Sequence, residues 1–118
     1  MIEGISAITL ATHDMARSVR FYRVLELEIA YGGETATFTS FRAGGNFVNL
    51  ILQPAEQSWS WWGRVILYDP DLDAAHARLV AAGYHPHDVP RPAPWGERFF
   101  HVTDPDGHEV SLAWPLSG

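Results

Sequence analysis

The sequence contains no cysteine among its 118 residues. Disulfide bridges, a thiolate nucleophile and a Cys-ligated metal are therefore excluded. Long hydrophobic runs are missing as well. The sequence contains no stretch of about 18 apolar residues, which is the length that a membrane span requires. Residues 1–4 lack the basic region and the apolar stretch of a secretory signal. We therefore expect a cytoplasmic protein without a membrane partner.

Positive charge is scarce in this chain. Eight Lys and Arg residues stand against 14 Asp and Glu residues, which gives a formal net charge of −6. This balance argues against non-specific nucleic-acid binding, which depends on basic patches. The length fits one domain that buries about two-thirds of its unfolded surface. Aromatic residues are more informative, since three of the five tryptophans lie within residues 59–62.

Two similar segments indicate that the chain repeats one unit. Asp14 and Asp71 lie 57 residues apart, close to half the length, and each follows an apolar strand and precedes a helical pattern. An aspartate in this position is a natural N-cap, because its side-chain oxygen accepts from the free N–H groups of the first turn. Two such copies favour duplication of a domain half over a solenoid, which needs three or more units.

Periodicity predicts the same order of elements in both halves. In the first half we predict a helix from Asp14 to about Leu25 and strands over residues 5–12, 28–31, 35–41 and 47–53. In the second half we predict a helix over 71–82 and strands over 61–68, 97–103 and 109–114. A short segment over 85–89 completes it, followed by a loop with Pro90, Pro92 and Pro94. The prediction is an α+β fold of two tandem βαβββ modules, about 4–53 and about 60–115, within a single domain over 1–118.

The last two strands are joined by Asp104-Pro105-Asp106-Gly107. Pro105 fixes φ at the second turn position, and Gly107 can adopt the positive φ that closes such a loop. We therefore predict a tight hairpin here.

Three motifs occur together in this order. They are Asp14-x-x-Arg17-Ser18-x-x-Phe21-Tyr22-x-x-Leu25, Trp95-Gly96-x-Arg98, and the Asp104–Gly107 turn with its apolar strand. Over residues 5–115 the chain resembles the vicinal oxygen chelate superfamily, which includes glyoxalase I, bleomycin resistance proteins and extradiol dioxygenases. The resemblance implies curved sheets around a cavity, helices outside, and a homodimer.

Enzymes of that superfamily hold a divalent metal on four His, Glu or Gln side chains. The matching positions in this chain are Ala7, Asn49, Arg64 and Ser111. Alanine has no donor atom, and an arginine guanidinium is a permanent cation without a lone pair. We therefore expect no metal at the family position and no cofactor.

The same positions are candidates for ligand binding. Arg64 must be paired if it points inward, either with Glu109 or with an anionic group of a ligand, and the two interpretations are compatible. Asn49 and Ser111 would lie on the cavity wall by family geometry, although polar strand residues usually face solvent.

The tryptophans and histidines leave alternatives open. Trp61 and Trp62 suit a clamp over a planar ligand, and Trp95 suits a lid, but packing or a dimer interface is equally compatible with them. Among the histidines, His101 is the candidate general base, and Glu109 is a second one if burial raises its pKa. The other five are expected to be structural or solvated, with His76 on the outer side of its helix: His13, His76, His85, His87 and His108.

The leading functional hypothesis is a metal-independent protein of the bleomycin-resistance type that sequesters a small, partly aromatic molecule. The alternative is an enzyme of the same fold, a lyase, isomerase or dioxygenase, with shifted metal ligands or with Glu109 or His101 as base. A third possibility is a scaffold module that uses the fold for dimerisation.

Overall fold

The computed structural model describes residues 1–117. It consists of two compact units, of which the first spans Met1–Ser60 and the second begins at Trp61. No helix among the described residues is long and apolar enough to cross a membrane.

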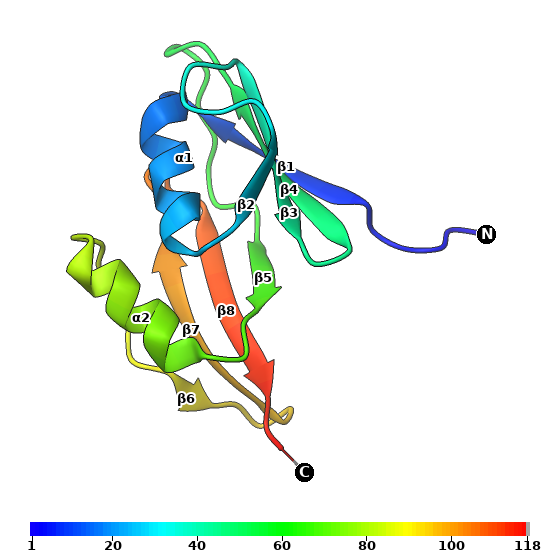
Figure 1. The fold of residues 1–118 in the computed structure, drawn as a ribbon, viewed down its shortest axis with the longest axis vertical. Coiled ribbons are helices and arrows are strands. Elements are labelled where there is room, and N and C mark those ends of the chain that lie inside the picture. Colours follow the sequence, from blue (N-terminus) through cyan, green and yellow to red (C-terminus); the bar gives the residue numbers. More distant parts are fainter. Residues whose placement is uncertain (118) are drawn as a thin grey trace. The chain divides into compact units, whose positions relative to one another are not determined.

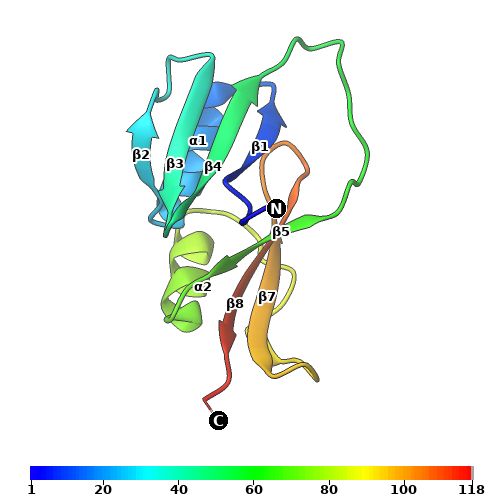
Figure 2. The ribbon, with the colours of Figure 1, turned by 90° about the vertical axis from the view of Figure 1, so that its right-hand side faces the viewer.

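The first unit contains one helix and one mixed sheet. Its elements are β1 (Ala7–Thr12), α1 (Met15–Val24), β2 (Glu28–Tyr31), β3 (Phe38–Ala43) and β4 (Asn46–Leu52). The strand order is β1-β4-β3-β2, with β1 parallel to β4 and the other pairs antiparallel. Figure 2 shows these four strands side by side with α1 behind them.

The second unit repeats this architecture. Its elements are β5 (Arg64–Tyr68), α2 (Leu72–Ala81), β6 (Arg91–Pro92), β7 (Glu97–Thr103) and β8 (Glu109–Pro115). The order is β5-β8-β7-β6, again with one parallel pair, β5 with β8 (Figure 1). The predicted α+β fold of two βαβββ modules is confirmed.

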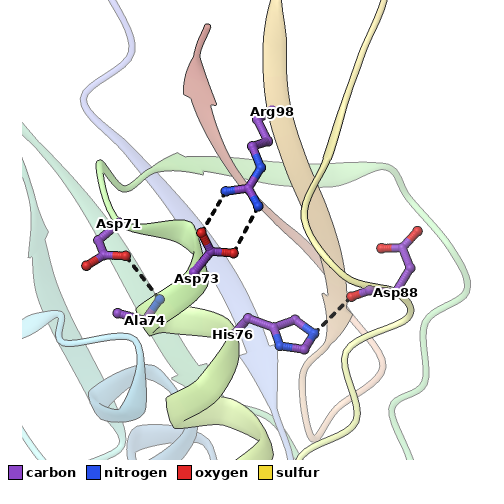
Figure 3. Close-up of polar contacts among 6 residues, drawn as sticks. All are labelled: Asp71, Asp73, Ala74, His76, Asp88 and Arg98. Atoms are coloured by element: carbon purple, nitrogen blue, oxygen red, sulfur yellow. Dashed lines mark hydrogen bonds and ion pairs between the residues drawn. The ribbon is translucent and has the colours of Figure 1, made fainter.

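Both predicted helix caps are present. The Asp14 side chain accepts a hydrogen bond from the Arg17 backbone N at 3.1 Å, and the Asp71 side chain accepts one from the Ala74 N at 3.1 Å (Figure 3). Each cap satisfies an N–H group that the first helical turn leaves unpaired. The repeated aspartates therefore start the two helices at equivalent places.

Successive side chains of a strand point to opposite faces of its sheet, and one face of each sheet packs against a helix. In the first sheet Phe41, Val48 and Leu50 are buried on the face that meets Tyr22 of α1. In the second sheet Phe100 and Leu112 are buried on the face that α2 covers. We call the opposite face of each sheet its helix-free face. Residues of β5, β7 and β8 that pair in register on the second helix-free face are Arg64, Ile66, Tyr68, Phe99, His101, Thr103, Glu109, Ser111 and Ala113.

The edge strand of the second sheet differs from the prediction. It lies at Arg91–Pro92, not at 85–89, and pairs only with β7. Pro92 is compatible with this position because an edge strand has one side without a partner strand. The segment before it contributes one backbone bond, from His87 N to His101 O at 2.9 Å. Similarly, β5 begins at Arg64, so Trp61 and Trp62 precede the strand.

The expectation that His76 lies on the outer side of its helix is wrong. Its ring packs edge-on against Phe100, with centroids 5.2 Å apart, and its Nε2 lies 3.1 Å from the Asp88 carbonyl oxygen (Figure 3). On the same helix Asp73 accepts two hydrogen bonds from Arg98 of β7, at 2.9 and 3.0 Å. These contacts attach α2 to its sheet and to the segment before β6.

Candidate functional site

The first sheet carries two of the four candidate positions. Ala7 and Asn49 belong to β1 and β4, and Asn49 pairs in register with Thr9. The Asn49 side chain donates from Nδ2 to the Thr9 hydroxyl at 3.2 Å. Its Oδ1 is buried and accepts no hydrogen bond within the described part of the chain. A buried amide oxygen without a donor favours an additional hydrogen bond from a ligand or from water.

Arg64 and Ser111 lie close together on the second sheet. The parallel register places Arg64 opposite Glu109 and Ile66 opposite Ser111. The Arg64 Nε donates to the Glu109 carboxylate, so the ion pair expected from the sequence is present. Ser111 is 3% exposed and faces His101 across the β7–β8 ladder. This strand pairing therefore brings one ion pair, one hydroxyl and one imidazole together.

The charges around this group shift two pKa values. The hydrogen bond from Arg64 lowers the pKa of Glu109, outweighing the opposing effect of burial. The possibility that burial raises the pKa of Glu109 is therefore wrong, and the residue is a charged acceptor at neutral pH. Burial also lowers the pKa of His101, and the Arg64 charge adds to this effect. His101 is consequently a neutral imidazole at neutral pH, with a buried Nδ1 that has no hydrogen-bond partner within residues 1–117.

His87 lies beside His101. Its Nε2 is 2.7 Å from the Thr103 hydroxyl, and the two imidazole centroids are 6.3 Å apart. Sequence reasoning treated His87 as structural or solvated. Its backbone bond to β7 is what places it beside the candidate base.

Aromatic rings follow the polar group along β7. Phe99 packs against His101 with centroids 5.1 Å apart and against Trp95 at 5.6 Å. The indole Nε1 of Trp95 donates to Glu97 at 2.8 Å, while the other carboxylate oxygen of Glu97 accepts from the Tyr68 hydroxyl. Alternation within β7 could have placed residues 97, 99 and 101 on one face, but it could not have indicated Tyr68 as their neighbour.

The remaining tryptophans have different surroundings. Trp62 is half-exposed and donates from Nε1 to His108 Nδ1 at 2.7 Å. Trp59 lies against the ring of His13, with centroids 4.5 Å apart. Trp61 is largely exposed. These contacts give Trp59 and Trp62 packing partners, while ligand binding by Trp61, Trp62 and Trp95 stays a prediction.

The duplicated βαβββ architecture defines the class of protein. The chain belongs to the Glyoxalase/Bleomycin resistance protein/Dioxygenase superfamily, whose family model matches residues 4–112. It is similar to a metallothiol transferase, FosB, of Shouchella clausii (strain KSM-K16). The two are 31% identical over an alignment of 124 positions, which covers 95% of this chain and 80% of that protein.

Solved structures share the fold. A glyoxalase/bleomycin resistance protein/dioxygenase from Nocardioides is 26% identical, with a TM-score of 0.71, covering 100% of this chain and 87% of that one. A bleomycin resistance determinant encoded on the transposon Tn5 has a TM-score of 0.75 at 18% identity, covering 96% of this chain and 98% of that one. The latter likeness concerns the fold alone.

The residues at the positions that the sequence resemblance assigns to the family's metal ligands do not fit a divalent cation. Ala7 offers no donor atom, and Arg64 places a guanidinium where a ligand would be needed. Among residues 1–117 no three His, Asp or Glu side chains form a group that could hold a metal ion. The described side chains therefore offer no ligand set for a metal-dependent step.

Proposed function

We propose that this chain is a metal-independent binding protein of the glyoxalase/bleomycin-resistance type, which sequesters a small, partly aromatic molecule in a cavity. The observation that carries the proposal is the Arg64–Glu109 ion pair, in which Arg64 stands at a position that the resemblance assigns to a metal ligand. A guanidinium held there repels a divalent ion but still offers hydrogen bonds to a ligand, because the pair uses Nε and arginine has five N–H donors.

Each candidate residue has a physical role in this proposal. Arg64 and Ser111 fix the orientation of the ligand by hydrogen bonds, and the unpaired Nδ1 of His101 adds a third polar contact. Trp61, Trp62 and Trp95 supply apolar area for an aromatic group. On the first sheet, and independently of these residues, Asn49 stays a proposed ligand contact through its unpaired Oδ1. A homodimer and a cytoplasmic location stay predictions from the sequence.

A specific observation favours an enzyme as the second candidate. His101 is neutral and lies opposite Ser111, next to the charged Glu109, so it could accept a proton at neutral pH. The similarity to a protein named metallothiol transferase supports the same alternative. In this case His101 would be the general base and Arg64 would bind an anionic group of the substrate.

Metal content is the first test. Untagged protein is analysed before and after incubation with Ni²⁺, Zn²⁺, Mn²⁺ and Fe²⁺, followed by gel filtration. We expect no stoichiometric uptake of any of the four ions. Uptake of one ion per chain would contradict metal independence and support the enzyme alternative.

Ligand binding is the second test. Planar aromatic compounds are screened by thermal shift, and a bound compound is recovered and analysed by mass spectrometry. For a ligand that accepts hydrogen bonds from Arg64, Arg64→Met should weaken binding by about 1.5–3 kcal/mol. Arg42→Met is the matched control, because Arg42 forms an exposed ion pair with Glu28 on the first sheet. Unchanged affinity would make Arg64 a structural residue, and recovery of a converted compound would show turnover.

A further inference from the structure

Glu97 has an unusual set of partners. It is a half-buried residue at the start of β7, and each of its carboxylate oxygens accepts a hydrogen bond from a different segment. Trp95, in the turn before β7, donates through Nε1 at 2.8 Å, and Tyr68, at the end of β5, donates through its hydroxyl. The carboxylate thus ties together two aromatic side chains that are 27 positions apart in the sequence.

Neither partner neutralises the carboxylate. An indole N–H and a phenol hydroxyl are uncharged donors at neutral pH. The chain has no lysine, and each of the four arginines in the second unit pairs with another carboxylate. The pairs are Arg64–Glu109, Arg78–Asp69, Arg91–Asp88 and Arg98–Asp73. Glu97 therefore forms no ion pair among the described residues.

The two rings that contact Glu97 are accessible. Trp95 is 67% exposed and Tyr68 is 61% exposed. Each is supported by a further ring, Trp95 by Phe99 at 5.6 Å and Tyr68 by Trp114 at 5.7 Å. Exposed aromatic rings held in place by hydrogen bonds and packing offer their π-faces without a large loss of side-chain entropy on binding.

A cation already lies on this aromatic group. The Arg91 guanidinium carbon is 5.1 Å from the centroid of Phe99, within the range of a cation–π contact. Phe99 is in turn in contact with Trp95. The aromatic surface next to Glu97 is therefore compatible with positive charge.

We propose that Glu97, Tyr68 and Trp95 form a subsite for the cationic group of an organic ligand, a quaternary or protonated amine carried on an aromatic ring. The inference rests on the proposed binding function and names the charge of its ligand. A quaternary ammonium is weakly hydrated and is attracted both by aromatic faces and by a nearby carboxylate. An anionic group at the same place would be repelled by Glu97.

The test compares two ligands of equal shape. The probes are 3-hydroxyphenyltrimethylammonium and its neutral isostere, 3-tert-butylphenol. Binding is followed by the indole N–H signals in ¹H–¹⁵N NMR spectra, with the Trp95 signal assigned from a Trp95→Phe variant. We expect the cation to bind at least about tenfold more tightly than the isostere and to shift the Trp95 signal. Its affinity should fall between about 50 mM and about 500 mM NaCl, while that of the isostere should not.

The variants distinguish the effect of the Glu97 charge from the effect of the net charge of the protein. Glu97→Gln should weaken cation binding by about tenfold and leave the isostere unaffected. Glu56→Gln is the matched control, because it removes the same charge from an exposed residue of the first unit. Trp95→Leu should reduce cation binding while Tyr68 and Glu97 stay in place. Far-UV circular dichroism of each variant verifies that the fold is retained.

The outcomes distinguish this inference from the proposed function. Equal affinity for the two probes would overturn the cationic subsite and leave binding of an aromatic molecule intact. A cation preference that survives Glu97→Gln would also overturn it. Failure of both probes to shift the Trp95 signal would overturn the subsite, while the proposed function would still be decided by metal content and by the ligand screen.

Discussion

Replacing Asp104 tests how the hairpin positions the candidate site. Asp104 is 4% exposed, and its Oδ1 accepts hydrogen bonds from the backbone N of Asp106 and of His108, both at 2.9 Å. These bonds shape the turn that sets the register of β7 and β8. That register places His101 opposite Ser111. Asp104→Ala therefore perturbs the support of the site without touching the site itself.

The structure sets the size of the effect. The Asp106 N is only partly buried, so water can replace the lost acceptor there at small cost. The His108 N–H is buried and would be left without that acceptor. Since a net hydrogen bond to a charged group contributes about 1.5–3 kcal/mol, and a buried unpaired donor costs a similar amount, Asp104→Ala should lower the free energy of unfolding by about 2–4 kcal/mol.

The assay is guanidinium unfolding monitored by circular dichroism. Asp104→Asn is the matched control, because its amide oxygen can accept both bonds but carries no charge. We expect the asparagine variant to retain more than half of the stability that the alanine variant loses. A loss of less than about 0.5 kcal/mol in Asp104→Ala would refute the reasoning, since the turn would then hold without the side chain.

Two further predictions concern the same unit. Gly107 has φ +89°, and a Cβ built there meets nothing within 4 Å, so the cost of Gly107→Val is conformational. Gly107→Val should lower the free energy of unfolding in guanidinium by about 1–2 kcal/mol. Gly45→Val is the control and should cost less, because a Cβ at Gly45 also meets nothing within 4 Å and Gly45 has no positive φ. Equal costs for the two variants would contradict the turn geometry. The lowered pKa of His101 means that the unfolded chain binds a proton first as the pH falls through 6.5. The stability that neutral His101 contributes is therefore fully present above pH 6.5. It is lost as the pH falls toward the lower pKa that His101 has in the folded protein. The urea midpoint measured from about pH 8 to about pH 5 should fall less in His101→Phe than in the wild type, and an identical fall in both would exclude this contribution.

Features set by neighbours in the chain were predictable from the sequence. The caps at Asp14 and Asp71 depend on bonds to residues three positions later, and the positive φ of Gly107 depends on its place in a four-residue turn. In β1 Leu10 is buried and its neighbour Thr9 is exposed, as expected from the alternation of side chains between the two faces of a strand. The repeat of these local signals was sufficient for the fold class.

The surroundings of the candidate site could not be predicted without knowing the strand register. The sequence indicated that Arg64 and Glu109 could pair, but only the parallel β5–β8 ladder shows that their hydrogen bond lowers the pKa of Glu109. The edge strand at Arg91–Pro92 was missed because its proline-rich sequence is typical of a loop, and a single neighbouring strand decides its state.

The sequence by itself determined the two βαβββ modules, their helix starts and their turns, because these depend on hydrogen bonds and periodicities within a few residues. Tertiary structure decided that Tyr68, Trp95 and Glu97 meet, and that the half-buried His101 lies beside an ion pair. Those contacts join strands that are distant along the chain. Their charge balance follows from which side chains the ladder places opposite one another, a property that no local pattern encodes.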